Sequence, residues 1–354
     1  MNLLTMITPA EGLALAMLIA LIVYALLGGA DYGAGVWDLL ASGRRAEAQR
    51  ELIARAIGPV WEANHVWLIV VIVLLFTGFP RAFSAVMIAL HVPLSLMLIG
   101  VVLRGSAFAF RSHDATELAR RRWNPVFSVP SVLTPALLGA VIGAIATGEP
   151  GRAVEAGGAV PFFSTWLRPF PLVVGVFALN LFAYLAAVYL TLETSDSELR
   201  EDFRLRALVS AITLGGVAWV VYRMAKIHAP LVYEGLRNEA WGGPLRYATG
   251  AFAVSAIVAL WTRRYHLARM AAMVQAALIL WGSALAQNPW LVPPHIDIAG
   301  SAAPPIVLKL LLIALGLGSL ILVPSLVYLF RVFKGHTFAM GRRDEFGALR
   351  TRSE

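Results

Sequence analysis

Nine long apolar segments dominate this chain of 354 residues. A helix needs about 20 mostly apolar residues to cross the hydrocarbon core of a bilayer, and each segment is close to that length or longer. The sequence therefore predicts an all-α integral membrane protein with nine transmembrane helices. The predicted spans are 12–38, 60–80, 82–103, 123–147, 169–192, 206–224, 245–262, 267–288 and 306–330.

The composition supports a membrane protein and excludes several other classes. Only 14% of the residues are charged, whereas soluble domains carry about a quarter. The chain has no cysteine, which excludes disulfides, thiolate metal sites and iron–sulfur clusters. The net charge of +8 comes from basic residues in short loops between apolar runs, and this pattern argues against nucleic-acid binding.

The distribution of lysine and arginine predicts the orientation in the membrane. The loops after the first, third, fifth and seventh spans, together with the C-terminal tail, hold 19 of them, and the alternate set of loops holds five. Since cytoplasmic loops are rich in these residues, the N-terminus is predicted outside and the C-terminus in the cytoplasm. Residues 1–11 contain no Lys or Arg, so the first apolar run is interpreted as a span and not as a leader.

The spans are predicted to form one transmembrane domain over residues 1–334, followed by a basic cytoplasmic tail over 335–354. Most connections are short, which favours antiparallel packing of consecutive helices. The loops 148–168, 225–243 and 289–305 are longer and rich in glycine and proline, and all three are expected on the outer side.

Three charged residues are candidates for function because charge inside a membrane is costly. Asp31 lies in the run GGADYGAG, whose small residues allow another helix to approach closely. Glu62 follows Pro59 at the start of the second span, and Arg104 ends the third. All three lie at the predicted cytoplasmic level, where two acids and a base can form a proton-conducting or anion-holding cluster.

Each of these residues also has a purely structural interpretation. Asp31 is then an interfacial acid solvated from the cytoplasm, and Glu62 a first-turn acid that the helix dipole stabilises. Arg104 is then an anchor at the inner end of its helix. Trp61 and Trp67 have the pattern of interfacial aromatic residues.

Histidine gives no support for a haem or metal site in this chain. Among seven histidines only His65 and His91 lie within predicted spans, and no pair has the i, i+4 spacing of a shared metal ligand. For both we expect hydrogen bonds between helices rather than iron ligation. No haem ligand, metal site or nucleotide-binding motif is predicted.

Two motifs give the chain a specific resemblance. The run GADYGAG at 29–35 resembles the first-helix G-x-D-x-G-x-G signature of subunit II of cytochrome bd-type quinol oxidases. The run GPVWEANHVWLI at 58–69 resembles the second-helix signature of the same family. Segments similar to the family continue along nearly the whole chain, at 79–83, 103–105, 187–194, 289–294 and 324–335.

The resemblance implies a fold and a role in respiration. The fold is two four-helix bundles plus one peripheral helix in a bacterial inner membrane. The role is that of the haem-free partner in a heterodimer, which stabilises a haem-bearing subunit I. That complex oxidises quinol and reduces dioxygen to water with cytoplasmic protons. The haems, b and d or b only, belong to subunit I, so this chain alone is expected to be catalytically silent.

The resemblance also assigns residues. Asp31 and Glu62 match acids of a proton path, and Arg104 matches an arginine near the subunit interface. Trp67 matches a tryptophan associated with oxygen entry, and Trp61 and His65 are predicted on the same route or at the interface. The second-helix acid is often Asp in the family and is Glu62 here. Gly28 stands where some members carry a further acid, and FAFR at 108–111 where many carry another, which implies a shorter or more water-dependent path.

Further partners and other functions stay open. Some family members hold a structural quinone in this subunit, and a small accessory transmembrane subunit and membrane lipid are further candidate partners. One alternative is a proton-coupled secondary transporter, although the halves show no clear repeat and the acids lie near the inner face. Another is a purely structural assembly subunit.

Overall fold

The computed structural model describes residues 8–58, 61–113, 117–157 and 162–350. Within these ranges nine helices are long and apolar enough to cross a membrane, and they coincide with the nine predicted spans. The prediction of an all-α membrane protein is therefore confirmed. The nine helices are α1 (Pro9–Leu39), α3 (Trp61–Gly78), α4 (Pro80–His113), α5 (Glu117–Thr147), α7 (Pro169–Leu190), α8 (Ser197–His228), α10 (Gly242–Trp261), α11 (Tyr265–Gln287) and α13 (Pro305–Arg350).

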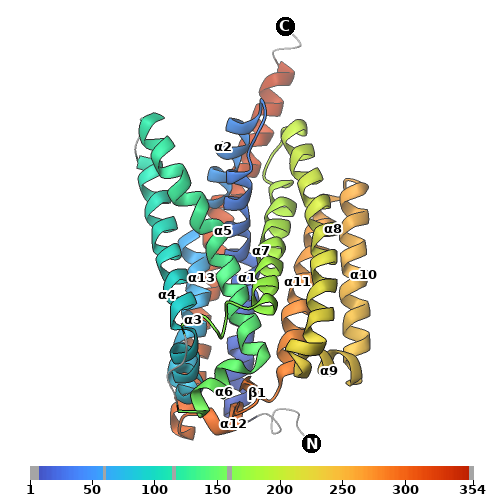
Figure 1. Ribbon diagram of the computed structural model, residues 1–354. Coiled ribbons are helices and arrows are strands. Elements are labelled where there is room, and N and C mark those ends of the chain that lie inside the picture. The colour runs from blue at the N-terminus through green and yellow to red at the C-terminus, as the bar shows by residue number, and fades with distance from the viewer. Residues whose placement is uncertain (1–7, 59–60, 114–116, 158–161, 351–354) are drawn as a thin grey trace, which may run out of the picture.

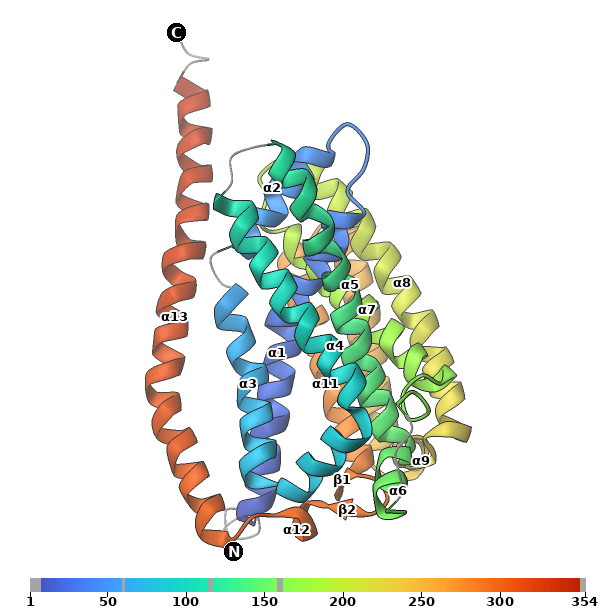
Figure 2. The same ribbon diagram turned by 60° about the vertical axis from the view of Figure 1, so that its left-hand side comes forward.

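Short elements connect the spans at the two ends of the molecule. They are α2 (Ala46–Ile57), α6 (Glu149–Glu155), α9 (Pro230–Asn238), α12 (Ile298–Ser301) and the antiparallel strands β1 (Trp290–Val292) and β2 (Ile296–Asp297). Figures 1 and 2 show α6, α9, α12 and β1 together at one end and α2 at the other. The three long loops therefore share one end of the bundle, as the sequence predicts.

Several helices are longer than their apolar cores. Helix α4 continues to His113 and α13 to Arg350, and α8 already begins at Ser197. The side chain of Asp196 accepts hydrogen bonds from the backbone N–H groups of Glu198 and Leu199, at 2.8 and 3.2 Å, and this N-cap starts α8 within a charged stretch. Helix α4 thus extends beyond the predicted span 82–103.

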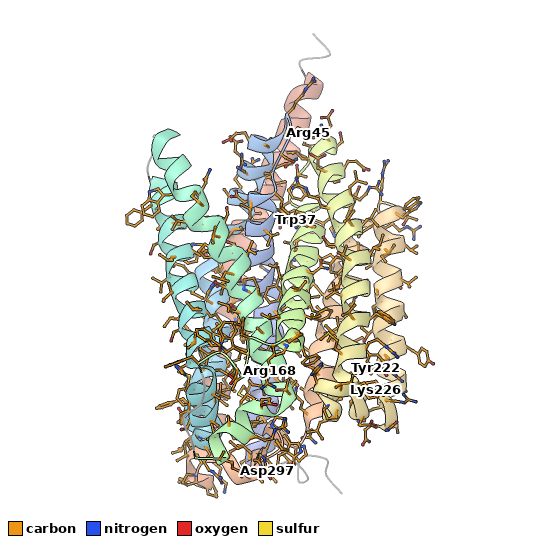
Figure 3. The ribbon with its side chains drawn as sticks, viewed as in Figure 1. Trp37, Arg45, Arg168, Tyr222, Lys226 and Asp297 are labelled. Atoms are coloured by element: carbon orange, nitrogen blue, oxygen red, sulfur yellow. The ribbon has the colours of Figure 1, made fainter. Side chains whose placement is uncertain are left out.

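Arg45, the residue before α2, links this connector helix to the start of α8. The Arg45 guanidinium donates two hydrogen bonds to the Asp202 carboxylate, at 2.6 and 2.9 Å, and one to Glu198 at 2.9 Å. Such fork-shaped pairing adds geometric specificity to the contact. In Figure 3, Arg45 lies toward the end of the molecule opposite to Arg168 and Asp297.

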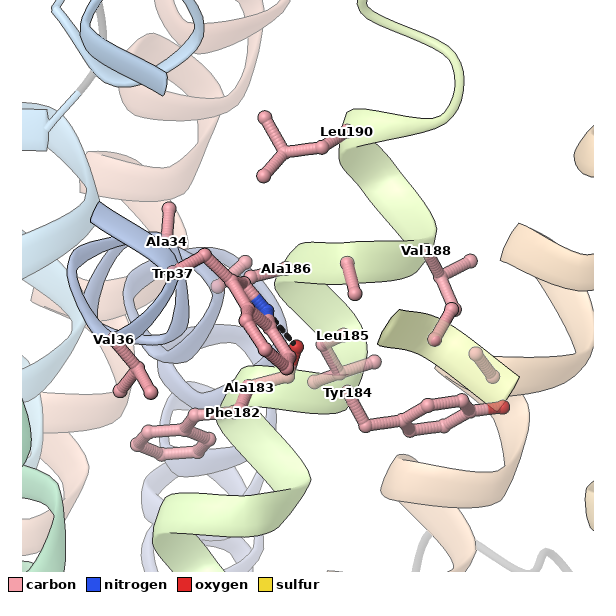
Figure 4. Packing of buried hydrophobic residues seen from close by; sticks show 14 of the residues in the cluster. Ala34, Val36, Trp37, Phe182, Ala183, Tyr184, Leu185, Ala186, Val188 and Leu190 are labelled. Carbon is pink, nitrogen blue, oxygen red and sulfur yellow. Dashed lines mark hydrogen bonds between the residues drawn. The ribbon is translucent and has the colours of Figure 1, made fainter. Parts of the chain in front are cut away.

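Glycines on α1 allow it to pack directly on the backbone of α7. A Cβ atom on Gly33 would lie 1.9 Å from the Phe182 carbonyl oxygen, and one on Gly29 would lie 2.5 Å from the Phe182 ring. One turn further, the Trp37 indole Nε1–H donates to the Ala183 carbonyl oxygen at 2.7 Å (Figure 4). The predicted close approach of another helix at this glycine-rich run is confirmed.

Helix α1 lies in the middle of the molecule and α13 at its edge. Helix α1 packs against α3, α5, α7, α11 and α13, whereas α13 packs mainly against α1 and α3. In the most apolar window of α13 only 6% of the residues are buried, against 56% in α5. The grouping into two four-helix bundles stays a prediction, as does the division into a domain over 1–334 and a tail over 335–354.

The absence of cysteine allows a direct test of the predicted orientation. We expect Ala156→Cys, at the α6 end, to react in intact spheroplasts with a maleimide that cannot cross membranes. Ser42→Cys, at the α2 end, is expected to react only after permeabilisation. Both positions are exposed. The reverse labelling pattern would show that the charge count gave the wrong orientation.

The α1–α7 contact predicts a strong effect of one added methyl group. Gly33→Ala forces two backbones apart, and overpacking of this kind costs about 1–3 kcal/mol. We therefore expect a lower thermal unfolding midpoint for the purified protein. The matched control is Gly216→Ala on α8, where an added Cβ meets nothing within 4 Å. Equal midpoints for the two variants would contradict this account of the packing.

Candidate functional site

Buried polar side chains gather where α1, α3, α4 and α5 meet. Asp31, Asn64, Arg104 and Ser131 are each at most 7% exposed. The Asn64 amide Nδ2 donates a hydrogen bond to Oδ2 of Asp31 at 2.6 Å. Because polar groups removed from water need hydrogen-bond partners, these side chains fix one another in place.

Arg104 is the buried cation of this cluster. Its Nη2 donates to the backbone carbonyl of Asp31 at 2.9 Å, and its Nε donates to Ser131 Oγ at 3.1 Å. The guanidinium also lies 4.6 Å from the ring centroid of Tyr32 and 5.2 Å from that of Phe127, distances at which an aromatic face attracts a cation. Arg104 is 2% exposed and lies inside α4, so its interpretation as an anchor at a helix end was wrong.

His65 completes the aromatic side of the cluster. Its Nδ1 lies 2.9 Å from the Trp61 carbonyl oxygen, and its Nε2 lies 3.2 Å from the Tyr32 hydroxyl. A carbonyl only accepts, so Nδ1 is the donor and Nε2 accepts from Tyr32. This bond between α3 and α1 confirms the hydrogen bond between helices that was expected for His65. His91 instead bonds within its own helix, to the Ile88 carbonyl at 3.0 Å, so the expected bond between helices was wrong there.

A second buried acid lies two turns along α1. Asp38 is 2% exposed and accepts a hydrogen bond from Ser128 Oγ at 3.2 Å. Seven residues separate it from Asp31, which corresponds to about 10 Å along a helix axis. Ser131 lies one turn from Ser128 on α5, and its hydroxyl accepts from Arg104 and donates to the Phe127 carbonyl at 2.7 Å. We call Asp38, Ser128, Ser131, Arg104 and Asp31 the polar file.

Glu62 does not join the polar file, although it was predicted beside Asp31 and Arg104. Its side chain is exposed on α3. Asn64 faces Asp31, and a residue two positions away on a helix points to nearly the opposite side. The structure therefore brings Asp31 and Arg104 together and leaves Glu62 at the surface of the chain.

The two tryptophans of α3 lie against the same region. The Trp61 ring packs near Phe108, with centroids 5.7 Å apart, and near His65, at 6.2 Å. Trp67 is half-buried against the core that contains Trp37 and Phe182. Its indole N–H is buried and has no hydrogen-bond partner among the described residues. Both aromatic residues thus extend the cluster along α3.

Comparison with known proteins identifies the family. The sequence profile described as cytochrome bd terminal oxidase subunit II matches residues 11–333. The chain belongs to this family. The oxidase-subunit interpretation is therefore favoured over the transporter alternative. Nine spans and this family make the chain a multi-pass protein of the bacterial inner membrane, whereas the orientation of its termini stays a prediction.

Relatives and a solved structure agree with this family. Subunit 2 of the cytochrome bd-I ubiquinol oxidase of Escherichia coli K12 is 28% identical over 216 residues, 58% of this chain and 55% of the relative. A cytochrome bd ubiquinol oxidase subunit 2 of Bacillus subtilis 168 is 28% identical over 124 residues, 35% of this chain and 36% of the relative. These matches span about half or less of the relatives' length.

The solved structure is the bd oxidase of Geobacillus thermodenitrificans. Its matching chain gives a TM-score of 0.71 at 23% identity, with 92% of this chain and 98% of that chain covered. This likeness supports the fold.

Three of the five residues of the polar file, Asp38, Ser128 and Ser131, were not singled out from the sequence, and neither was the neighbouring Asn64. Asp38 lies at the very end of its predicted span. Ser128 and Ser131 have a recognisable signal, since with Thr134 they repeat every three residues along one face of α5. Such a polar stripe in an apolar helix predicts a face turned toward other helices. Among the described residues, no group of three or more His, Cys, Asp or Glu side chains is placed to hold a metal.

The bond between Asn64 and Asp31 can be tested by truncation. Hydrogen bonds to charged groups contribute about 1.5–3 kcal/mol, so Asn64→Ala is expected to lower the thermal unfolding midpoint clearly. The matched control is Asn180→Ala, which removes an exposed bond to Thr213 of 3.0 Å and is expected to cost less than about 1 kcal/mol. If Asn180→Ala lowers the midpoint as much as Asn64→Ala does, the buried bond has no special role.

Proposed function

We propose that the chain is the haem-free subunit II of a cytochrome bd-type quinol:oxygen oxidoreductase. It pairs with a haem-bearing subunit I, and the redox chemistry belongs to the haems of that partner. The quinol is the substrate of the complex. The observation that carries this proposal is the burial of Asp31 with Asn64 and Arg104 inside a chain of this family.

The polar file is proposed to conduct protons toward the partner. A relay needs groups that can take up and release a proton, and the carboxyls of Asp38 and Asp31 have this chemistry. Ser128 donates to Asp38, and the Ser131 hydroxyl lies against Gly35, between the two acids on α1. Arg104 keeps its proton under all ordinary conditions, so its part is to position Ser131 and to balance negative charge.

The other predicted residues are assigned to the surface toward subunit I. Glu62 is exposed on α3, the helix that also carries Asn64. In the proposed complex its carboxyl takes up a proton or meets a polar group of the partner. Trp61 and Trp67, on the same helix, are proposed to line an apolar route for dioxygen, and His65 fixes the position of Trp61 relative to Tyr32.

Neutralising Asp31 tests the proton path. In the assembled oxidase we expect Asp31→Asn to keep the haem spectrum and to lower quinol-driven oxygen consumption at least about tenfold, since a positioned proton-transfer group contributes about 10²–10⁴-fold. The measurement is oxygen uptake per haem. Asp31→Glu, which keeps the carboxyl, is expected to restore part of the rate.

A charge control separates this effect from a general loss of charge. Glu47 is an exposed acid on α2, and Glu47→Gln is expected to leave turnover unchanged. Full turnover in Asp31→Asn with normal haem content would contradict the proposed proton path and favour a purely structural role. Purification of the chain alone, without a haem-bearing partner, would overturn the proposed complex.

A further inference from the structure

A cavity of about 400 Å³ lies between the end of α7, the start of α8 and the turn that joins α10 to α11. It is separate from the polar file. It opens at the end of the bundle opposite to α6, α9 and α12, the end predicted to face the cytoplasm. Its lining comes from Thr191, Leu192, Arg200, Arg263, Arg264, Tyr265, His266 and Leu267.

The lining is basic and contains no acidic side chain. Three arginines and one histidine contribute to it. Arg263 forms an ion pair at 3.6 Å with Glu201, which lies outside the lining. That carboxylate is also held by the guanidinium of Arg204, with Nε at 2.9 and 3.0 Å from its two oxygens. The lining itself therefore carries three arginines and no acid.

The cavity has a fixed wall and an open rim. Arg200 donates to the backbone carbonyls of Thr191 and Thr194, and its guanidinium lies 5.7 Å from the Tyr265 ring centroid. These contacts hold Arg200 in the wall. Arg263, Arg264 and His266 are exposed at the rim.

The backbone of the turn presents these side chains in an unusual conformation. Arg263 has a φ of 59°, in the left-handed region that favours glycine. The N–H of Arg264 closes the end of α10 by donating to the Ala259 carbonyl at 2.8 Å. Helix α11 starts here without a side-chain cap, so its first N–H groups add donors and a positive dipole end at the same place.

A second cavity of similar size shows that this charge is not a general property of the bundle. It lies near the opposite end and is lined by Arg152 and Arg168 together with Glu149. Both arginines pair with Glu149, at 3.6 and 3.2 Å. Its lining thus includes the acid that balances its arginines, whereas the lining at the α10–α11 turn holds three arginines and no acid.

We propose that the cavity at the α10–α11 turn binds the phosphate headgroup of an anionic phospholipid. Guanidinium groups and a helix N-terminus are matched to phosphate oxygens. Leu192 and Leu267 supply apolar surface beside the cations, which suits a headgroup attached to acyl chains. Clusters of basic residues at the end of membrane spans attract anionic lipids in this way.

The test measures stabilisation of the purified oxidase complex by added headgroups. The probes are dioctanoyl phosphatidylglycerol, dioctanoyl phosphatidylcholine and inorganic phosphate, each added to the delipidated complex in neutral detergent. We expect phosphatidylglycerol to raise the thermal unfolding midpoint and the other two probes to have little effect. In R263G/R264Q most of this shift is lost. Glycine suits the φ of residue 263, so this change removes charge without backbone strain.

Two control variants separate the effect of charge from the effect of position. R263K/R264K keeps the charge and is expected to retain the response, as is R44Q, which removes an exposed arginine outside the cavity. Equal shifts with phosphatidylcholine, or an unchanged response in R263G/R264Q, would overturn the proposal. An equal shift with phosphate alone would reassign the cavity to the free anion. If the double variant does not assemble, the single variants R264Q and H266Q are measured in its place, since both side chains are exposed.

Discussion

The contact between α1 and α7 without intervening side chains is the constraint on which the rest of the structure depends. Gly29 and Gly33 present no side chain to α7, and the space that a Cβ would fill is occupied by the Phe182 ring at Gly29 and by the Phe182 backbone at Gly33. In lipid, apolar surface gains little from leaving the solvent, so close van der Waals packing and buried hydrogen bonds must hold helices together. This contact places α1 in the middle of the molecule, and with it the carboxyl of Asp31.

Much of the fold could be predicted because membrane-spanning helices are recognisable in a sequence by their length and apolar composition. The two predicted spans with short apolar cores, which correspond to α8 and α10, were recognisable too. Their ends were less predictable, since the N-cap at Asp196 and the burial of Arg104 let helices continue through charged residues. A hydropathy pattern ends a span at an arginine. In this structure hydrogen bonds and two aromatic faces accommodate Arg104 in the interior of a helix.

The site was predicted only in part, for a related reason. Motifs named Asp31 and Arg104, and the structure brings both into one cluster. They also named Glu62, but the direction of a side chain depends on which face of α3 meets α1, and Asn64 occupies that face. Asp38 and the serines of α5 were missed because a single sequence does not show which helices become neighbours. Their periodicity predicts a buried face but not the partner of that face.

The combination of Arg104 with Asp31 has a consequence for the proposed proton path. The guanidinium of Arg104 is held by the backbone carbonyl of Asp31, by Ser131 and by two aromatic faces. The carboxyl of Asp31 is held by a different group, the neutral amide of Asn64. The cation and the acid are therefore fixed by separate contacts, and Arg104 can keep its place whether or not the carboxyl carries a proton. A group that exchanges protons within a packed bundle needs surroundings that do not rearrange with each exchange, and these separate contacts supply them.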